Sequence, residues 1–529
     1  MRRDYDAIVV GGGHNGLTAA AYLAKGGLRT LVLEARETVG GAAVTEEIHP
    51  GYRCSTASYV VSLLRPEVVS DLALKRHGYE TIPVTEGYLQ MADGRHLVMT
   101  GAEDRDRAEV GRHSNRDYEA MQRFQAVLDA VGEVVRDRFL QAPPALAGGG
   151  VKDLLAALSL GNAFRRLSAD QRHRALQLFT ASLEDLLERW FDSEPVRLFY
   201  AASGLAGSFV GLAHPGSAVN LLHLSLGEID GVRGAWALAR GGMGSITQAM
   251  ARAAEAQGAE IRTAHPVRRI LVRGGRADGV ELADGTDIGA RAVLSNCDPK
   301  RTFLGLVGEA HLPAEFRRDI ACLKMESASF RTTLALSGLP EFAAVPGGDI
   351  GPQHRGFIRL MPGWDELQGL YHIAKQGWIP ETPVIDAMIP SSLDDSLAPP
   401  GCHVMTLLCQ HYPYRLADGR SWQELKAETE ARIIDRLTLY APNIKDILVA
   451  ATSYSPLDLE QVFGLTGGDV YHGQLTPDQL FSLRPHPTAA QYATPLAGLY
   501  LCGAGAHPGG GVSGAPGHNA ARRVLRDLK

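Results

Sequence analysis

Several features are scarce in this 529-residue sequence, and each scarcity excludes a class of protein. The six cysteines are scattered, and no two have the CxxC spacing of a redox pair or a zinc site. A disulfide reductase is therefore excluded, and the thiols are expected to be free, reduced and buried. They are Cys54, Cys297, Cys322, Cys402, Cys409 and Cys502. Neither HExxH nor GxSxG occurs, and no metal site is predicted.

A strong charge of one sign and long apolar runs are also lacking. The formal net charge of -6 gives no reason to expect a nucleic acid partner. No apolar run reaches the length of a membrane span, although peripheral membrane contact stays open. Because 45% of the residues are hydrophobic, the chain can bury large cores, and its length indicates two to four domains.

The N-terminal stretch YDAIVVGGGHNGLTAAAYLAKGGLRTLVLEA, residues 5–35, has the pattern of a strand, a glycine-rich turn, a helix and a strand. Its glycines have the GxGxxG spacing of a dinucleotide fingerprint, and an acid follows about 20 positions later. The first glycine permits a tight turn, the second brings helix amides to a pyrophosphate, the third lets helix and strand pack closely, and the acid binds ribose hydroxyls. The residues predicted to bind the dinucleotide here are Gly11, Gly12, Gly13, His14, Asn15, Gly16 and Glu34.

A second glycine pair follows the ribose acid in ARETVGGAAVTEE, residues 35–47. This stretch resembles the extension found in flavoproteins of the glutathione reductase structural group, where paired glycines pass beside the diphosphate and ribityl chain of FAD. Nicotinamide dehydrogenases seldom have such an extension. The dinucleotide is therefore predicted to be FAD, with further contacts from Ala35, Arg36, Gly40, Gly41 and Ala42.

The sequence closes on another glycine-rich stretch, LYLCGAGAHPGGGVSGAPGHNAARRVL, residues 499–525. Such a cluster indicates a backbone that approaches another group closely or adopts positive φ. In similar flavoproteins this strand and helix return to the first domain and cover the flavin. The likeness implies that Gly503 and Gly505 lie near the diphosphate. It also implies a helix whose first turn, at Gly511, Val512 and Ser513, points its amides at the pyrimidine edge of the flavin.

The middle of the chain predicts a further part of the same domain. Residues 244–297 have the pattern of a helix followed by short strands, with turns at GGRADG and ADGTD. In related flavoproteins this segment places the backbone at the position of Val267 beside the adenine. The glycine cluster ARGGMGSITQAM, residues 239–250, lacks a preceding βαβ pattern and a ribose acid, so no separate NAD(P)H domain is predicted. Electrons are expected to leave to oxygen, a quinone or a protein carrier.

Together these segments predict an α/β fold, in which a Rossmann-type FAD-binding domain of the glutathione reductase type is joined to a discontinuous α+β substrate domain. The FAD-binding domain is expected to comprise residues 1–85, 239–299 and 485–529. Residues 86–238 and 300–484 would form the substrate domain with its helical part. Within it, RALQLFTASLEDLLERWF, residues 174–191, has apolar residues at helical spacing.

Over nearly the whole chain, the sequence resembles the phytoene desaturase and carotenoid isomerase superfamily. The segments that carry the resemblance are GGGHNGLTAAAYLAKGG, GGAAVTEEIHPGYRCSTASYVVSLLRPEV, RWFDSEP, GAWALARGGMGS, IPSSLDDSLAPPGCHV and LYLCGAGAHPGGGVSGAPGHNAARRVLRDLK. The resemblance implies desaturation, saturation or isomerisation of a hydrophobic small molecule, with hydride transfer between a substrate carbon and flavin N5. Relatives in animal mitochondria carry an extra N-terminal stretch that is missing here, which predicts a bacterial cytoplasmic protein.

Four side chains are candidate catalytic residues. His507 follows the C-terminal strand in GAHPGG, where an imidazole could titrate near neutrality as an acid or base. His214 and His223 lie in GLAHPGSAVNLLHLSLGE, and Arg240 precedes the GGMG turn. Each has a structural alternative, because a histidine beside Pro or Gly is often hydrogen-bonded in the fold, and an arginine can hold flavin or a carboxylate by charge. Tyr59 would line a substrate passage or pack in the core.

Two functional classes stay open. The first is an FAD-dependent oxidoreductase that acts on a lipophilic or unsaturated small molecule, with a reduced-flavin isomerase as the second candidate within that class. The other class is a flavoprotein that mainly binds a partner and in which FAD stabilises the fold. The sequence leaves the substrate, the net direction of redox and the oligomeric state open.

Overall fold

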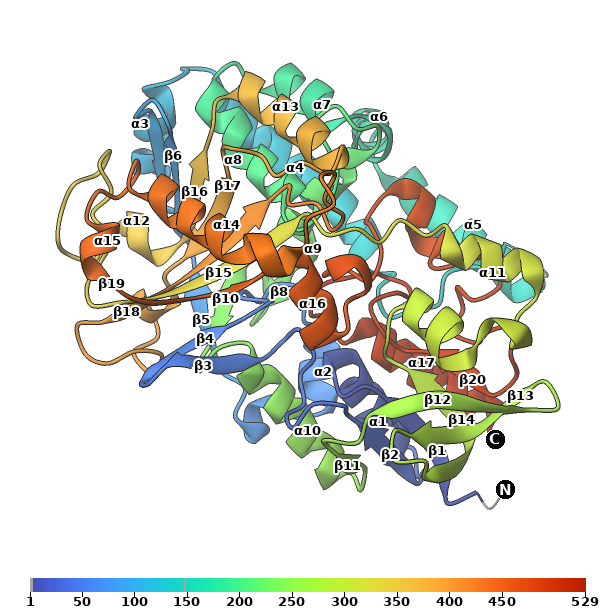
Figure 1. Ribbon diagram of the computed structural model, residues 1–529. Helices are drawn as coiled ribbons and strands as arrows, with labels where there is room; N and C mark the ends of the chain where they lie inside the picture. The colour runs from blue at the N-terminus through green and yellow to red at the C-terminus, as the bar shows by residue number, and fades with distance from the viewer. Residues whose placement is uncertain (1–2, 147–148) are drawn as a thin grey trace.

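The computed structural model describes residues 3–146 and 149–529, and Figure 1 shows them arranged around two large sheets. The first sheet has the strand order β11-β2-β1-β14-β13-β12, with β20 also paired to β14. Pairing is parallel from β11 through β2 and β1 to β14 and β20, whereas β12 and β13 extend β14 as an antiparallel meander. Its strands are β1 (Tyr5–Val10), β2 (Thr30–Leu33), β11 (Glu260–Arg262), β12 (Val267–Arg273), β13 (Arg276–Leu282), β14 (Asp287–Ser295) and β20 (Leu499–Leu501).

Three helices cover one face of this sheet: α1 (His14–Lys25), α10 (Gly244–Ala256) and α17 (Ala515–Asp527). The face of α1 is rich in alanine, so α10 and α17 can pack closely on either side of it. The predicted strand, turn, helix and strand of residues 5–35 are thereby confirmed, as is the Rossmann-type class. The parallel order, with strands from both ends of the chain, explains why segments so far apart in sequence meet in one layer.

The second sheet has the order β19-β15-β18-β17-β16-β6-β7 and lies above the first in Figure 1. All pairs of neighbouring strands in this sheet are antiparallel, except that β6 and β16 run parallel to each other. Its strands are β6 (Gly87–Met91), β7 (His96–Met99), β15 (Ser329–Leu336), β16 (Phe357–Met361), β17 (Val384–Met388), β18 (His403–Gln410) and β19 (Leu448–Tyr454). Short two-stranded pairs are β3 (Thr45–His49) with β4 (Tyr52–Ser55), β5 (Thr81–Val84) with β10 (Trp236–Ala239), and β8 (Glu228–Ile229) with β9 (Val232–Arg233).

The remaining helices mostly surround the second sheet. They are α2 (Pro66–Asp71), α3 (Glu103–Gly111), α4 (Asp117–Arg136), α5 (Val151–Arg166), α6 (Ala169–Thr180), α7 (Leu183–Trp190), α8 (Glu194–Leu205), α9 (His223–Leu226), α11 (Ala314–Ala321), α12 (Pro352–Arg355), α13 (Trp364–Lys375), α14 (Trp422–Leu437), α15 (Ile444–Ile447) and α16 (Pro456–Phe463). Shorter turns are η1 (Leu74–His77), η2 (Ser217–Leu222), the π-helical η3 (Arg301–Val307), η4 (Glu309–His311), η5 (Pro390–Ser392), η6 (Thr466–Gly468), η7 (Pro477–Gln479) and η8 (Phe481–Leu483). The predicted boundaries between two domains stay a prediction.

Two local expectations, on the start of the closing helix and on the burial of all cysteines, were wrong. The closing helix begins at Ala515 and not in the glycine stretch, because Gly511 and Gly514 have φ of +95° and +71°, which a right-handed helix cannot contain. The apolar stretch 174–191 is helical, as its spacing predicts, and it is divided between α6 and α7 because Ser182 caps α7 by accepting a hydrogen bond from the Asp185 amide at 3.0 Å. Of the six free cysteines, Cys322 is exposed rather than buried.

Candidate active site

A cavity of about 710 Å³ lies between the two sheets. On one side it is lined by the residues that follow β1 and β2, including Gly11 and Glu34. On the other side it is lined by residues of β16 and β17, including Arg359 and Asp386. The carboxyl ends of neighbouring parallel strands are where open α/β sheets bind ligands, so the first sheet presents its usual binding edge to this cavity.

The glycine turn after β1 forms one wall. Gly11 has φ +99° and so makes the tight turn that a side chain would disfavour. A Cβ on Gly16 would lie 2.2 Å from the Gly11 carbonyl oxygen, which is why the third glycine of the motif lets α1 begin against the turn. Gly12 and Gly16 do not themselves line the cavity, whereas Gly13, His14 and Asn15 do. The backbone amides at the start of α1 therefore border an open space that favours an anion.

Glu34 organises the loops around this wall. Its carboxylate accepts a hydrogen bond from the Gly12 amide at 2.7 Å and one from the Arg36 amide at 2.9 Å. The second glycine pair lies alongside, because the Gly40 amide donates to the Gly12 carbonyl at 2.9 Å. Ala35, Arg36, Gly40, Gly41 and Ala42 all line the cavity, as does Val267 at the start of β12. Most of the residues predicted to bind the dinucleotide are thus brought to one cavity, with Gly12 and Gly16 as exceptions in the first turn.

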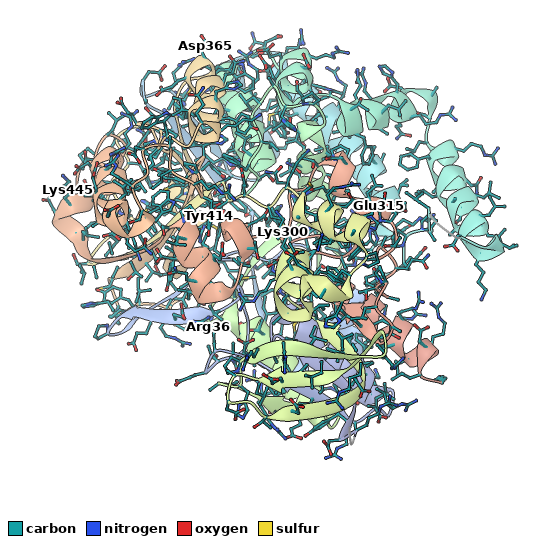
Figure 2. All side chains as sticks on the ribbon, turned by 45° about the vertical axis from the view of Figure 1, so that its right-hand side comes forward. Arg36, Lys300, Glu315, Asp365, Tyr414 and Lys445 are labelled. Atoms are coloured by element: carbon teal, nitrogen blue, oxygen red, sulfur yellow. The ribbon has the colours of Figure 1, made fainter. Side chains whose placement is uncertain are left out.

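Three buried polar atoms among these residues have no protein partner: Nε2 of His14, Oδ1 of Asn15 and Nη1 of Arg36. Burial, and next the charge of His472, lowers the pKa of His14 to about 4, so its ring is neutral at physiological pH. Arg36 stacks its guanidinium 5.0 Å from the Phe463 ring, where the two sheets approach each other (Figure 2). Free donors and acceptors beside a glycine backbone and a helix N-terminus suit a diphosphate with two sugars. The residues present therefore fit FAD.

The loop between β20 and α17 closes the cavity from another side. Gly511 and Val512 line it, and a Cβ on Gly511 would come within 2.5 Å of the Leu63 side chain. Gly503 does not reach the cavity, because its backbone packs on Asn296, whose carbonyl oxygen would be 2.5 Å from an added Cβ. Its neighbour Ala504 lines the cavity instead. The glycine-rich C-terminus therefore serves close backbone packing as much as contact with a ligand.

Of the four candidate catalytic residues, His223 alone is brought to the main cavity. His507 lines a second cavity of about 360 Å³, which shares Leu63 and His223 with the first. Burial lowers the pKa of both imidazoles to about 4, so the expectation that His507 titrates near neutrality was wrong. The Nε2 atom of His507 contacts the Arg138 carbonyl oxygen at 3.2 Å, as a structural histidine would.

His214 and Arg240 lie outside both cavities. His214 packs edge-on against Tyr371 with ring centres 6.5 Å apart. Arg240 is partly exposed and forms an ion pair with Asp395 at 2.9 Å, while the following Gly241 amide donates to Asp394. Asp394 and Asp395, which are distant in the sequence, thus bind the turn that was expected near the flavin. Tyr59, in contrast, lines the main cavity as one of its two predicted roles required.

Several residues that line the cavity were not predicted from the sequence. Asn296 and Cys297 follow β14 and line the cavity, and an added Cβ on Gly13 would lie 2.7 Å from Asn296 Nδ2. The signal was available, since a polar residue directly after a buried parallel strand marks the binding edge. Tyr471 and His472 also line the cavity, but they come from an irregular segment with no recognisable pattern.

A buried arginine fixes that irregular segment. Arg484 is 2% exposed and donates to the carbonyl oxygens of Tyr471 at 2.7 Å and Gly473 at 3.2 Å. It also donates twice to the carbonyl oxygen of Ala504, at 2.9 and 3.1 Å. One guanidinium therefore ties two cavity walls together, namely the segment around Tyr471 and the loop after β20.

A buried acid in the same segment predicts a pH effect on stability. Burial raises the pKa of Asp469 to about 7, against the amide of Tyr471 and the charge of Arg484, and its Oδ2 has no partner. A raised carboxyl pKa favours the folded state at low pH, and this contribution is lost as the pH rises from about 4 to about 7. Asp469→Asn keeps the acceptor for the Tyr471 amide, 2.8 Å away, without the charge.

We therefore expect Asp469→Asn to raise the melting temperature by at least about 3 °C at pH 8.5, and by much less at pH 5. Thermal unfolding of the flavin-bound protein, followed by flavin fluorescence, measures both values. Asp104→Asn, at an exposed site in α3, serves as the control and should change neither. An equal effect of Asp469→Asn at both pH values would show that the carboxyl ionises normally.

No three His, Cys, Asp or Glu side chains of the described residues come together as a metal site requires. Within residues 3–146 and 149–529, no helix combines the length and apolar character needed to cross a membrane.

Comparison with known proteins gives consistent results. The family described as flavin containing amine oxidoreductase matches residues 16–328. The chain is 40% identical over 551 residues to pyridine nucleotide-disulfide oxidoreductase domain-containing protein 2 of Rattus norvegicus, covering 100% of this chain and 94% of the rat protein. It is 25% identical to the lycopene-forming phytoene desaturase of Pantoea ananas, with 98% of this chain and 99% of that protein covered. The structure of putrescine oxidase with bound putrescine superimposes with a TM-score of 0.62 at 16% identity, over 99% of this chain and 98% of that one.

Proposed function

The chain belongs to the flavin containing amine oxidoreductase family, an FAD-dependent oxidoreductase family with desaturase relatives, and from this membership we propose its reaction. The protein dehydrogenates or saturates a hydrophobic small molecule within the main cavity. FAD, when bound, supplies hydride acceptance or donation at its N5 atom. The cavity that the FAD-type motifs line continues into an apolar space, and this single observation carries the proposal.

The apolar part of the cavity is lined by Met99, Phe199, Leu224, Trp236 and Phe357. These side chains come from β7, α8, α9, β10 and β16, so the wall is assembled from segments far apart in the sequence. Such a wall excludes water and orients a carbon skeleton by shape, which is what hydride transfer requires of the protein. The second cavity, also lined largely by apolar side chains, meets the first at Leu63 and His223 and extends the space for a long substrate.

The residues that line the cavity have different proposed roles. Glu34 and the glycine turns would hold the adenosine and diphosphate of FAD, and the Gly511–Val512 backbone borders the same space. His223 stacks on Tyr471 with ring centres 6.1 Å apart. Because burial lowers its pKa to about 4, the His223 imidazole is neutral and a weak base, and its proposed role is to orient a polar group of the substrate by a hydrogen bond. No proton transfer is proposed for His214, His223, His507 or Arg240.

Disulfide chemistry, which the rat relative's name includes, has no support in this chain. Burial raises the pKa of the Cys54 and Cys297 thiols to about 11 and that of Cys409 to about 12. A buried thiol of this kind is a poor nucleophile because little thiolate forms. The protein is therefore proposed to pass electrons to oxygen, a quinone or a protein carrier rather than to a disulfide.

The test is anaerobic mixing of the purified flavoprotein with lipophilic donors while the visible flavin band is followed. At least one donor should bleach the band. Leu224→Trp, which fills the cavity, should slow that bleaching at least 10-fold with an unchanged flavin spectrum, whereas Leu176→Trp on the exposed face of α6 should have no effect. Turnover that requires reduced flavin without net oxidation would identify the alternative, an isomerase. A flavin inert to every donor, together with a stable protein complex, would identify a scaffold.

Partner and location expectations stay predictions. The face of α5 exposes Val151, Leu154 and Leu158, and Leu160 of the same helix lines the second cavity. That face is the place where the predicted peripheral membrane contact would form.

A further inference from the structure

Two oppositely charged side chains face each other across neighbouring strands at the apolar part of the cavity. Arg359 of β16 and Asp386 of β17 are paired in the antiparallel register, and both line the cavity. Their exposed fractions are 4% and 5%, so both charges are nearly removed from bulk water. Charged groups at such depth ordinarily have a partner.

Arg359 is only partly satisfied by the protein. Its Nη2 atom donates to the Ser203 hydroxyl at 2.9 Å, while Nε and Nη1 have no partner. The guanidinium lies 4.1 Å from the centre of the Phe199 ring. Among the described residues, the Asp386 carboxylate accepts one long hydrogen bond, from the Tyr59 hydroxyl at 3.4 Å, and lies in no ion pair.

A second buried guanidinium lies beside the pair. Arg331 of β15 is 1% exposed and stacks 4.7 Å from the centre of the Tyr59 ring. Its Nη2 atom donates to the Thr406 hydroxyl at 2.8 Å and its Nε to the Thr56 carbonyl at 3.2 Å, but its Nη1 has no partner. The cluster therefore holds two guanidinium charges and one carboxylate, which leaves an excess of one positive charge.

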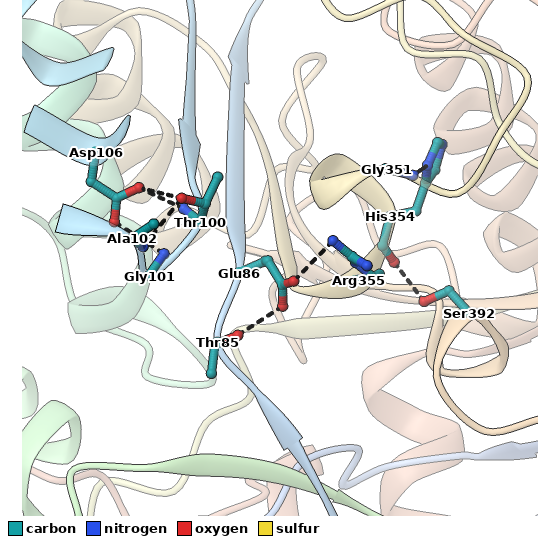
Figure 3. A network of polar contacts seen from close by, with 10 residues as sticks. All are labelled: Thr85, Glu86, Thr100, Gly101, Ala102, Asp106, Gly351, His354, Arg355 and Ser392. Atoms are coloured by element: carbon teal, nitrogen blue, oxygen red, sulfur yellow. Dashed lines mark hydrogen bonds and ion pairs between the residues drawn. The ribbon is translucent and has the colours of Figure 1, made fainter. Parts of the chain in front are cut away.

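Among the described residues, no other acid on the cavity wall near this cluster offsets its excess positive charge. Glu86 lines the cavity too, but Figure 3 shows its carboxylate held by Thr85 at 3.0 Å and by Arg355 at 3.2 Å. Burial raises the pKa of Asp386 to about 6, in spite of Arg359, the Tyr59 hydrogen bond and Arg331, so protonation at lower pH would increase the excess further. Burial also raises the pKa of Tyr59, Tyr200 and the Cys54 and Cys409 thiols, which are therefore neutral.

We propose that the substrate is an apolar molecule with one carboxylate, and that Arg359 binds this carboxylate inside the cavity. A guanidinium presents two parallel donors that match a carboxylate. One excess positive charge matches a carboxylate, whereas a phosphate carries nearly two negative charges at neutral pH. Phe199 and Phe357 flank the guanidinium, so the apolar part of the molecule can begin directly beside its charged end. This inference rests on the proposed function, in which the cavity takes an organic substrate.

The test is titration of the intact flavoprotein with three probes below their micellar concentrations: dodecanoate, dodecanol and dodecyl phosphate. Binding is followed as a perturbation of the flavin absorption band, so no turnover is needed. Dodecanoate should bind at least 10-fold more tightly than dodecanol and more tightly than dodecyl phosphate. Equal affinity for dodecanoate and dodecanol, or tighter binding of the phosphate, would overturn the proposal.

Variants locate the site. Arg359→Met should weaken dodecanoate binding at least 10-fold and leave the affinity for dodecanol within about twofold of its original value. Arg359→Lys should lose less affinity for dodecanoate than Arg359→Met. Arg317→Met, which removes an exposed ion pair with Glu309, serves as the control and should change neither affinity. If Arg359→Met does not fold, the relative affinities of the unsubstituted protein for the three probes, and the affinities of the Arg359→Lys variant, still test the proposal. Failure of all three probes to bind would contradict the proposed function as well, whereas binding of dodecanol without preference for dodecanoate contradicts this inference alone.

Discussion

Replacing Gly517 with alanine is expected to unfold the flavin site. Gly517 lies in the first turn of α17, where the helix crosses α1. An added Cβ would lie 2.0 Å from the Asn15 carbonyl oxygen and 3.0 Å from the Ala19 amide nitrogen. Both neighbours are backbone atoms of a buried helix, so neither can rotate away. The two helices must separate, and the destabilisation should reach about 3 kcal/mol or more.

The same separation displaces residues that line the cavity. His14 and Asn15 form the first turn of α1 and border the space that fits FAD. Gly517→Ala should therefore be purified with little flavin, shown by the ratio of visible to ultraviolet absorption, and with a melting temperature lowered by several degrees. Gly161→Ala in α5 is the matched control, because its Cβ meets nothing within 4 Å and alanine favours a helix. A Gly517→Ala protein with full flavin and an unchanged melting temperature would refute the packing argument.

Arg484→Met is expected to have a comparable effect through hydrogen bonds rather than through packing. The substitution keeps most of the side-chain length but leaves the carbonyl oxygens of Tyr471, Gly473 and Ala504 without their donor. Leaving a buried acceptor unsatisfied costs about 1–3 kcal/mol for each group. Even after the benefit of removing a buried charge, a loss of about 3–5 kcal/mol is expected.

Loss of this guanidinium also frees two walls of the cavity from each other. Flavin release during gel filtration and thermal unfolding should both report the change, and Arg484→Lys should be intermediate because it keeps the charge but not the fork of donors. The exposed Arg526→Met in the last turn of α17 provides the comparison and should alter stability by less than about 0.5 kcal/mol. If Arg484→Met retained flavin as firmly as Arg526→Met, the hydrogen bonds of the Arg484 guanidinium would have no role in the site.

The part of the site that its own residue pattern predicted is encoded within one short segment, whereas Val267, Gly511 and Val512, which also line the cavity, were predicted from the resemblance to flavoproteins. The turn at Gly11, Gly13 and Gly16 and the acid Glu34 belong to one strand, helix and strand, so their spacing alone specifies their geometry. The class of fold followed from that unit together with the C-terminal strand that returns to the same sheet.

The remaining parts depend on contacts between distant segments. Arg484 donates to backbone carbonyl groups that only the folded chain brings near, and nothing beside it in the sequence indicates this. The start of α17 was misplaced because positive φ at Gly511 and Gly514 is a property of the surrounding structure. Arg240 was expected near the flavin from its position beside a glycine turn, yet it lies outside the cavity, where it forms an ion pair with Asp395, far along the chain.

We propose that one cavity serves both FAD and an organic substrate and that no nicotinamide reduces the flavin. Mixing the purified flavoprotein with NADH or NADPH in the absence of oxygen, while the visible flavin band is followed, tests this proposal. The flavin should stay oxidised with both nucleotides, whereas dithionite should reduce it fully and a lipophilic donor should bleach the band. Rapid bleaching by either nucleotide would overturn the proposal and would indicate a reductase driven by a pyridine nucleotide.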